Sequence, residues 1–131
     1  MLIPIFAAPL PFLLWPIEII LPYPYIVEEV AKAILLFFVL KLPGNQKIII
    51  TFLVGFLFAF SENVLYLFNI YSLGNMQTLL LRFVLTTPMH ILTSFVILGF
   101  GLLNRRLIFL GLALASIIHF LFNAFIILGK T

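Results

Sequence analysis

Apolar stretches occupy almost the whole chain, and they limit how it can fold more than any other feature. Five such stretches can be distinguished, at residues 4–21, 26–42, 47–71, 78–103 and 107–128. Only 8% of the 131 residues are charged, whereas a soluble domain carries about 25%. A soluble fold of this size has too little interior to bury so much apolar surface. The sequence therefore predicts one integral membrane domain, residues 1–131, with no soluble domain.

The lengths of these stretches predict an all-α, polytopic transmembrane bundle of about five helices, with four as the alternative count. A helix needs roughly 20 residues to cross ~30 Å of hydrocarbon, and only the stretch 26–42 is short. Six of the eight prolines lie within the first 24 residues, so we expect a bent first helix that spans the membrane or re-enters it. Turn signals follow at Pro43-Gly44-Asn45, at residues 72–77 and at Asn104.

Basic residues in two short loops predict the orientation. Lys41 and Lys47 flank the turn between the second and third helices, and Arg105 and Arg106 lie between the fourth and fifth. Both loops are on the same side, which the positive-inside rule places in the cytoplasm. In a cell membrane crossed by five helices, the first residue is then inside and Lys130 outside. The second helix therefore begins at the outer face.

Several chemistries are excluded by composition. The chain has no cysteine, which removes disulfides, thiolate metal sites and a cysteine nucleophile. The net charge of +3 is small and scattered, which argues against nucleic-acid binding. The chain also lacks aspartate. Acid–base chemistry must therefore draw on two histidines and four carboxylates: His90, His119, Glu18, Glu28, Glu29 and Glu62.

Ionisable residues on different helices are predicted to share one depth. Glu62 and His119 each lie roughly 13 Å below the outer end of their predicted helix, and His90 lies roughly 12 Å below Arg82, which is taken to mark the interface, at ~1.5 Å of rise per residue. Glu28 and Glu29 begin the second helix on that same side, with Lys32 one turn later. We expect these side chains to meet in the outer half of the bilayer.

Small and polar residues mark the faces that would meet. On the last helix, Gly111, Ala115, His119 and Asn123 follow at steps of four. Residues four apart share a helix face, and small residues let a neighbouring helix approach closely. Similar polar lines lie on the third helix (Thr51, Gly55, Ala59, then Glu62 or Asn63, and Tyr66) and on the fourth (Arg82, Thr86, His90, then Thr93 or Ser94). These lines predict a wet cavity, lined by protein and open to the outer side.

Each polar group also has a plain structural interpretation. A charge in the bilayer costs roughly 2.5–3.5 kcal/mol on insertion scales, so ionisable residues there are functional candidates. Yet Glu28, Glu29 and Lys32 could simply begin a helix among the headgroups, with Glu28 pairing Lys32. Glu62 could be a neutral acid bonding across helices, and a lone histidine could only join helices. Glu18 has no evident partner, and we interpret it as structural.

Four motifs occur in order, each on its own predicted helix. They are Glu28-Glu29-x-x-Lys32, then Phe58-x-x-x-Glu62-Asn63-x-x-Tyr66, then Arg82 with Pro88-x-His90 and Gly99, and finally His119-x-x-x-Asn123. This series resembles the PrsW family of intramembrane proteases. That family is similar to the CAAX prenyl proteases and to bacterial immunity-type membrane proteases. The resemblance runs from Glu28 to Asn123, and the chain is little more than this core.

The resemblance implies hydrolysis of a peptide bond near the outer membrane face, in single-span substrates such as membrane-anchored anti-sigma factors. It favours Glu28 as the base that activates water, with His90 helping to hold the water. Glu29 and Lys32 would orient the pair. A carboxylate held partly dry beside a histidine suits a general base. The developing oxyanion needs a donor, which Asn123, His119 or Arg82 could supply. Glu62 completes the catalytic set, with Asn63, Tyr66 and Arg82 in support.

Zinc is compatible with the sequence. Two histidines and a carboxylate form a known catalytic zinc set, and His90, His119 and Glu62 would be the ligands. The HExxH spacing is absent, so the sequence does not demand a metal. Metal-free glutamate chemistry is slightly favoured.

Two other functions fit the same residues. Glutamate, histidine, lysine and arginine inside helices also build proton relays, as in a proton- or cation-coupled transporter or a channel subunit. The absence of two related halves argues against alternating access. A non-catalytic membrane protein of the same fold, binding a lipid or a helix, is the third hypothesis. The intact set of acids and histidines favours the protease.

Overall fold

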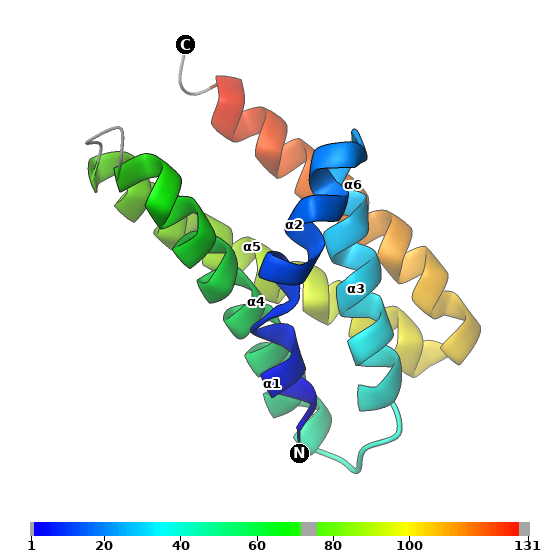
Figure 1. Cartoon of the computed structure of the whole chain (residues 1–131). Helices are drawn as coiled ribbons and strands as arrows, with labels where there is room; N and C mark the ends of the chain where they lie inside the picture. The colour runs from blue at the N-terminus through cyan, green and yellow to red at the C-terminus, as the bar shows by residue number, and fades with distance from the viewer. Residues whose placement is uncertain (1, 72–75, 129–131) are drawn as a thin grey trace.

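The computed structural model describes residues 2–71 and 76–128, a bundle of helices shown in Figure 1. The part of the chain that it describes contains no strand. The predicted all-α membrane bundle is confirmed. Four segments are long and apolar enough to cross a membrane: Ile3–Ile20, Gln46–Leu67, Leu80–Leu103 and Arg105–Ile126. Most of the predicted link at 72–77, and Lys130, lie outside the described residues.

The first predicted helix is divided into α1 (Ile3–Ala7) and α2 (Leu10–Ile20), with a break at Ala8 and Pro9. Each proline removes a backbone donor, so the expected bend occurs where prolines are dense. Leu21 has extended backbone and ends α2 before Pro22. The last turn of α2 and the first turn of α3 therefore lie at the same end of the bundle (Figure 1).

The buried face of α3 (Pro24–Val39) changes character along its length. It begins with Glu28, Glu29 and Lys32 and continues with Leu36 and Val39, the last four of these being fully buried. These positions recur every three or four residues, so they form one stripe on the helix. The stripe is polar toward the N-terminal end of α3 and apolar toward its C-terminal end. With 16 residues, α3 is too short to be one of the four long candidate spans.

The helices α4 (Gln46–Tyr71) and α5 (Met76–Leu103) run side by side in Figure 1 and approach each other closely at Gly55. A Cβ atom added at Gly55 of α4 would lie 2.7 Å from the Cα of Ile91 and 2.9 Å from the carbonyl oxygen of His90. Only glycine permits this separation. The contact fixes the position of α5 at the level of His90.

A 3-10 turn, η1 (Arg105–Leu107), leads into α6 (Ile108–Leu128). Asn104 begins this turn, and its side-chain oxygen accepts a hydrogen bond from the backbone N–H of Arg106. On α6, a Cβ added at Gly111 would lie 3.0 Å from the Cα of Ile97, and Ala115 is fully buried. The predicted stripe of small residues therefore packs against α5.

The interior is divided along the length of the helices. An apolar core surrounds the C-terminal half of α3 and includes Leu36, Val54, Ile97 and Ile108. The buried polar residues continue from it toward the N-terminal end of α3. Large apolar side chains cover the outer surfaces of the helices, as expected for a protein surrounded by lipid.

Candidate active site

Lys32 is the centre of the buried polar cluster. Its ammonium group is fully buried and donates three hydrogen bonds, to Glu29 Oε1 (2.6 Å), His90 Nδ1 (3.0 Å) and Thr93 Oγ1 (2.8 Å). The ring of Phe58 lies beneath it, with 5.3 Å between Nζ and the ring centroid. All three ammonium protons have a partner, so a buried charge that would otherwise be costly is compensated. Lys32 pairs with Glu29 and not, as the structural interpretation supposed, with Glu28.

His90 is held in one tautomer by these contacts. An ammonium group can only donate, so Nδ1 of His90 must accept, and its proton must be on Nε2. Nε2 accordingly donates to Glu62 Oε2. Thr93 and Ser94 lie one turn after His90 on α5, and both donate a hydrogen bond to its backbone carbonyl oxygen. The imidazole is fully buried and fixed at both nitrogens.

Glu62 is bound from two sides. Besides His90, it accepts a hydrogen bond from Arg82 Nη2 at 2.9 Å. The Arg82 guanidinium lies over the Tyr66 ring, 3.5 Å from the centroid, so Tyr66 supports it by a cation–π contact. Both oxygens of Glu62 are therefore engaged.

His119 lies between the two adjacent glutamates. Its Nδ1 is 2.9 Å from Glu29 Oε1, and its Nε2 is 3.7 Å from Glu28 Oε2, too far for a hydrogen bond. Its ring is 5.0 Å from that of His90. Glu28 Oε2 is buried and has no hydrogen-bond partner. The two adjacent acids thus have different surroundings, because neighbouring side chains on a helix point about 100° apart.

A cavity of about 230 Å³ adjoins this cluster. Its wall is formed by residues of four helices: Pro24, Glu28, Glu62, Tyr66, Arg82, Thr86, His119, Phe122, Asn123 and Ile126. Glu28, His119 and Asn123 therefore face the same space, whereas Glu29 and Lys32 lie behind it. Of the site residues predicted from the sequence, Asn63 alone is directed elsewhere. Its amide donates to the Ala59 carbonyl, and it borders a separate apolar pocket with Phe60 and Leu80.

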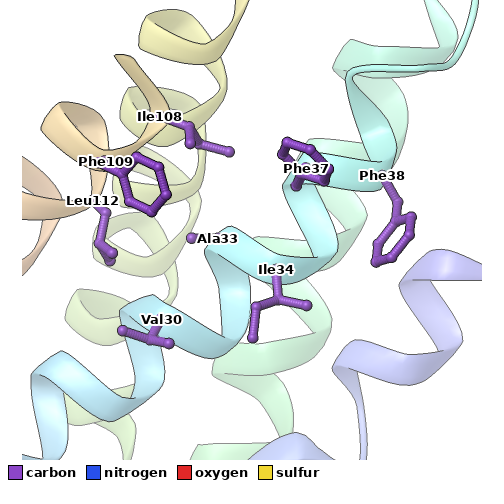
Figure 2. Close-up of a pocket in the computed structure, with 8 residues that line it drawn as sticks. All are labelled: Val30, Ala33, Ile34, Phe37, Phe38, Ile108, Phe109 and Leu112. Carbon is purple, nitrogen blue, oxygen red and sulfur yellow. The ribbon is translucent and has the colours of Figure 1, made fainter. Parts of the chain in front are cut away.

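A second cavity, of about 300 Å³, lies between α3 and α6 and is shown in Figure 2. Only apolar side chains line it: Val30, Ala33, Ile34, Phe37, Phe38, Ile108, Phe109 and Leu112. It offers no group for acid–base chemistry, so the polar cavity is the candidate active site.

Glu28, His90 and His119 form a group that could hold a metal ion, since one ligand atom from each lies within 4.8 Å of the other two. The sequence predicted Glu62 as the carboxylate of this set, but the structure places Glu28 with the two histidines. The residues fit a divalent metal. Glu28 Oε2 is buried and unpartnered, and among the described residues no hydrogen bond is made to Nε2 of His119, which lies 3.7 Å from Glu28 Oε2. Glu29 bonds the other nitrogen of His119, the arrangement that commonly orients a metal-binding histidine. His90 would exchange one of its present hydrogen bonds for the metal.

Glu18, on the last turn of α2, is the ionisable residue that sequence reasoning set aside. It is half-buried, and its Oε1 is buried without a partner.

Comparison with known proteins assigns the chain to a family. The family model described as PrsW family intramembrane metalloprotease matches residues 20–131, most of the chain. No curated protein and no solved structure matches it. The match includes all four motifs and every residue of the cluster, and it confirms the resemblance predicted from the motifs. The chain belongs to the PrsW family of intramembrane metalloproteases.

Proposed function

We propose that this chain hydrolyses a peptide bond of membrane-anchored protein substrates, with water activated in the polar cavity near the outer membrane face. Family membership supports peptidase activity in the membrane. One observation carries the assignment of the site. Glu28 presents a buried, unpartnered carboxylate oxygen at the wall of the cavity, beside the free nitrogen of His119.

Glu28 is the carboxylate best suited to accept the proton of the attacking water. Glu62 has both oxygens engaged, by Arg82 and by His90. Glu29 is fully buried behind the cavity and bonds Lys32 and His119. A water between Glu28 and His119 would lie within hydrogen-bonding reach of both, the geometry that a general base requires.

The donor set favours a divalent metal over the metal-free chemistry that the sequence alone slightly favours. Glu28, His90 and His119 would hold the ion, and zinc suits two imidazoles and a carboxylate. When bound, such an ion lowers the pKa of a coordinated water and polarises the scissile carbonyl group. A carboxylate has two oxygens, so Glu28 can hold a cation with one and accept a proton with the other.

Arg82 and Asn123 are the proposed donors to the oxygen of the scissile carbonyl. Both line the cavity together with Glu28. Arg82 is held by Glu62 and by the Tyr66 ring, which keeps its charge in a fixed place. A fixed donor is effective because it does not have to reorient as negative charge develops on the oxygen.

The proposed substrates are single-span membrane proteins, such as membrane-anchored anti-sigma factors. In the orientation that the positive-inside rule predicts, the two basic loops face the cytoplasm. One loop contains Lys41 and Lys47, and the other contains Arg105 and Arg106. The cavity then lies in the outer part of the bilayer, where the outer end of a substrate helix would reach it.

The test is cleavage of a set of single-span proteins by purified protein in proteoliposomes. Wild type should cleave at least one of them, and Glu28→Gln should lose activity by about 100-fold or more, the range of general-base contributions. Phe125→Leu, which changes an exposed side chain of α6, is the matched control and should keep wild-type activity. Unchanged cleavage by Glu28→Gln would rule the proposal out.

A further inference from the structure

The cavity between α3 and α6 has a wall made only of apolar side chains (Figure 2). Three of them, Ile34, Phe37 and Phe109, are exposed at the surface of the bundle. The cavity is therefore open on the side where a membrane protein meets lipid. Its volume of about 300 Å³ and its lack of polar side chains suit a hydrocarbon chain.

A transmembrane helix fits this wall less well than an acyl chain does. Helices that pack closely in a membrane meet at small residues. Among the eight lining residues Ala33 alone is small, and Figure 2 shows it between the larger side chains of both helices. Phe37 and Phe109 would keep the backbone of another helix away from it, whereas a single hydrocarbon chain can lie beside their rings.

A cation lies at one end of the cavity. The lining residues of α3 end with Phe37 and Phe38, whose rings form an edge-to-face pair with centroids 6.2 Å apart. The ammonium nitrogen of Lys41 is 5.9 Å from the centroid of the Phe37 ring and 5.4 Å from that of the Phe38 ring. These cation–π contacts hold the exposed Lys41 side chain beside the wall. The cavity is therefore apolar along its length and positively charged at this end.

The wall that α6 provides begins next to two more cations. Its first lining residue, Ile108, directly follows η1, which contains Arg105 and Arg106. The two walls meet at this end, because a Cβ added at Gly101, in the last turn of α5, would lie 3.0 Å from Cδ1 of Leu40. The C-terminal end of α3 thus packs against the end of α5 that leads into η1. Three basic residues are gathered at one end of the cavity.

These three cations have no acid of their own. The ion pairs of permanent cations within the described ranges, 2–71 and 76–128, are those of Lys32 with Glu29 and of Arg82 with Glu62. Neither Lys41 nor the two arginines of η1 takes part in one. An anionic group from outside the chain would supply the missing partner. A negative head group attached to a hydrocarbon chain matches both the charge and the apolar wall.

We propose that this cavity binds one anionic phospholipid, with an acyl chain against Ala33 and the phosphate beside Lys41. Arg105 and Arg106 add to the positive field that attracts the head group. The two loops concerned are those that the positive-inside rule predicts in the cytoplasm, where the leaflet is rich in anionic lipids. The proposal does not depend on peptidase activity, so either can fail without the other.

Lipid binding to purified protein tests the charge. Protein stripped of lipid in a neutral detergent is titrated with phosphatidylglycerol or with phosphatidylcholine of the same acyl chains, and bound lipid is counted by native mass spectrometry. Wild type should bind one phosphatidylglycerol at least about five-fold more tightly than phosphatidylcholine. Lys41→Gln should lose about five-fold in affinity for phosphatidylglycerol, the contribution of one basic residue near an anionic surface. Lys47→Gln removes the same charge from the same loop without bordering the cavity, and it should bind as wild type does.

A variant that fills the cavity tests the place of the acyl chain. Ala33→Leu keeps all three cations but occupies the space in the middle of the wall, so it should lose the tight binding of one phosphatidylglycerol. Equal affinities of wild type for the two lipids, equal losses in Lys41→Gln and Lys47→Gln, or wild-type binding by a folded Ala33→Leu would each overturn the proposal.

Photocrosslinking identifies the occupant in a membrane and leaves Ala33 unchanged. Phe109 is replaced by benzoylphenylalanine, and the protein is irradiated in vesicles of phosphatidylglycerol and phosphatidylcholine that also contain a single-span protein. The lipid adducts should contain more phosphatidylglycerol than its share of the vesicle. Adducts in proportion to the vesicle composition, or a main adduct with the single-span protein or with a second copy of this chain, would contradict a bound anionic lipid.

Discussion

The buried ammonium group of Lys32 is the single group on which the geometry of the site most depends. It connects Glu29 of its own helix to His90 and Thr93 of α5. Because an ammonium group can only donate, its contact with Nδ1 of His90 requires the imidazole proton to be on Nε2. A residue that looks like a headgroup-region cation in the sequence is therefore part of the interior.

Replacing Lys32 by methionine should destabilise the protein by about 3–5 kcal/mol, because Glu29 is left as a buried charge without its cation. The free energy of unfolding in mixed micelles measures the loss. The double variant Lys32→Met with Glu29→Gln removes both charges and should recover part of the stability. A single variant within about 1 kcal/mol of wild type, the range of exposed ion pairs, would contradict the buried pairing.

Asn123 is a proposed hydrogen-bond donor to the oxygen of the scissile carbonyl group, on which negative charge develops in the transition state. Asn123→Ala should therefore lower kcat by about 10²- to 10³-fold, as the loss of an oxyanion donor does. KM should change little, because the interaction is made in the transition state. Steady-state kinetics on a cleaved substrate give both constants. A raised KM with an unchanged kcat would instead assign Asn123 to ground-state binding.

The sequence predicts well where the helices lie along the chain. It does not predict how each helix is rotated about its own axis. Long apolar stretches determine where α4, α5 and α6 lie, and steps of four predict the packed face of α6. Spacing does not tell which of two acids on different helices turns toward a histidine. For that reason the sequence predicts Glu62 as the carboxylate of a metal set, whereas the structure groups Glu28 with His90 and His119. The sequence likewise predicts Asn63 at the site, whereas the structure directs its amide to the Ala59 carbonyl.

At the level of elements, the separation of α4 and α5 is fixed by Gly55. Gly55→Ala would put a methyl group 2.7 Å from the Ile91 Cα, so one helix must shift at the level of His90. We expect a loss of about 1–3 kcal/mol in stability, the usual cost of overpacking. Gly99→Ala on α5 is the matched control, since no atom lies within 4 Å of its added Cβ. Equal unfolding free energies for the two variants would contradict the close contact.

For the whole molecule, the sequence predicts the membrane fold from composition alone, because a chain so poor in charge has few alternatives. It also predicts that the polar residues converge, since their depths agree. It could not predict the direction that the chain takes after the break at Ala8 and Pro9, because no helical periodicity encodes that direction.

The orientation can be measured by single-cysteine labelling, for which a chain without cysteine is well suited. Asn45→Cys and Asn104→Cys replace exposed residues in the two basic loops, and Tyr23→Cys replaces an exposed residue between α2 and α3. A membrane-impermeant maleimide applied to intact cells should label Tyr23→Cys alone. Inverted vesicles should show labelling of the other two, because basic loops stay in the cytoplasm. The opposite pattern would place the cavity in the inner half of the bilayer.

The most direct test of the central claim is the position of the cleaved bond. Purified wild-type protein is reconstituted with a single-span substrate, and the fragments are identified by mass spectrometry. The cavity between Glu28, His119 and Asn123 predicts one major cut in the outer third of the substrate's transmembrane segment, absent with Glu28→Gln. A cut at the cytoplasmic end of that segment, or the same fragments from Glu28→Gln, would contradict this account of the site.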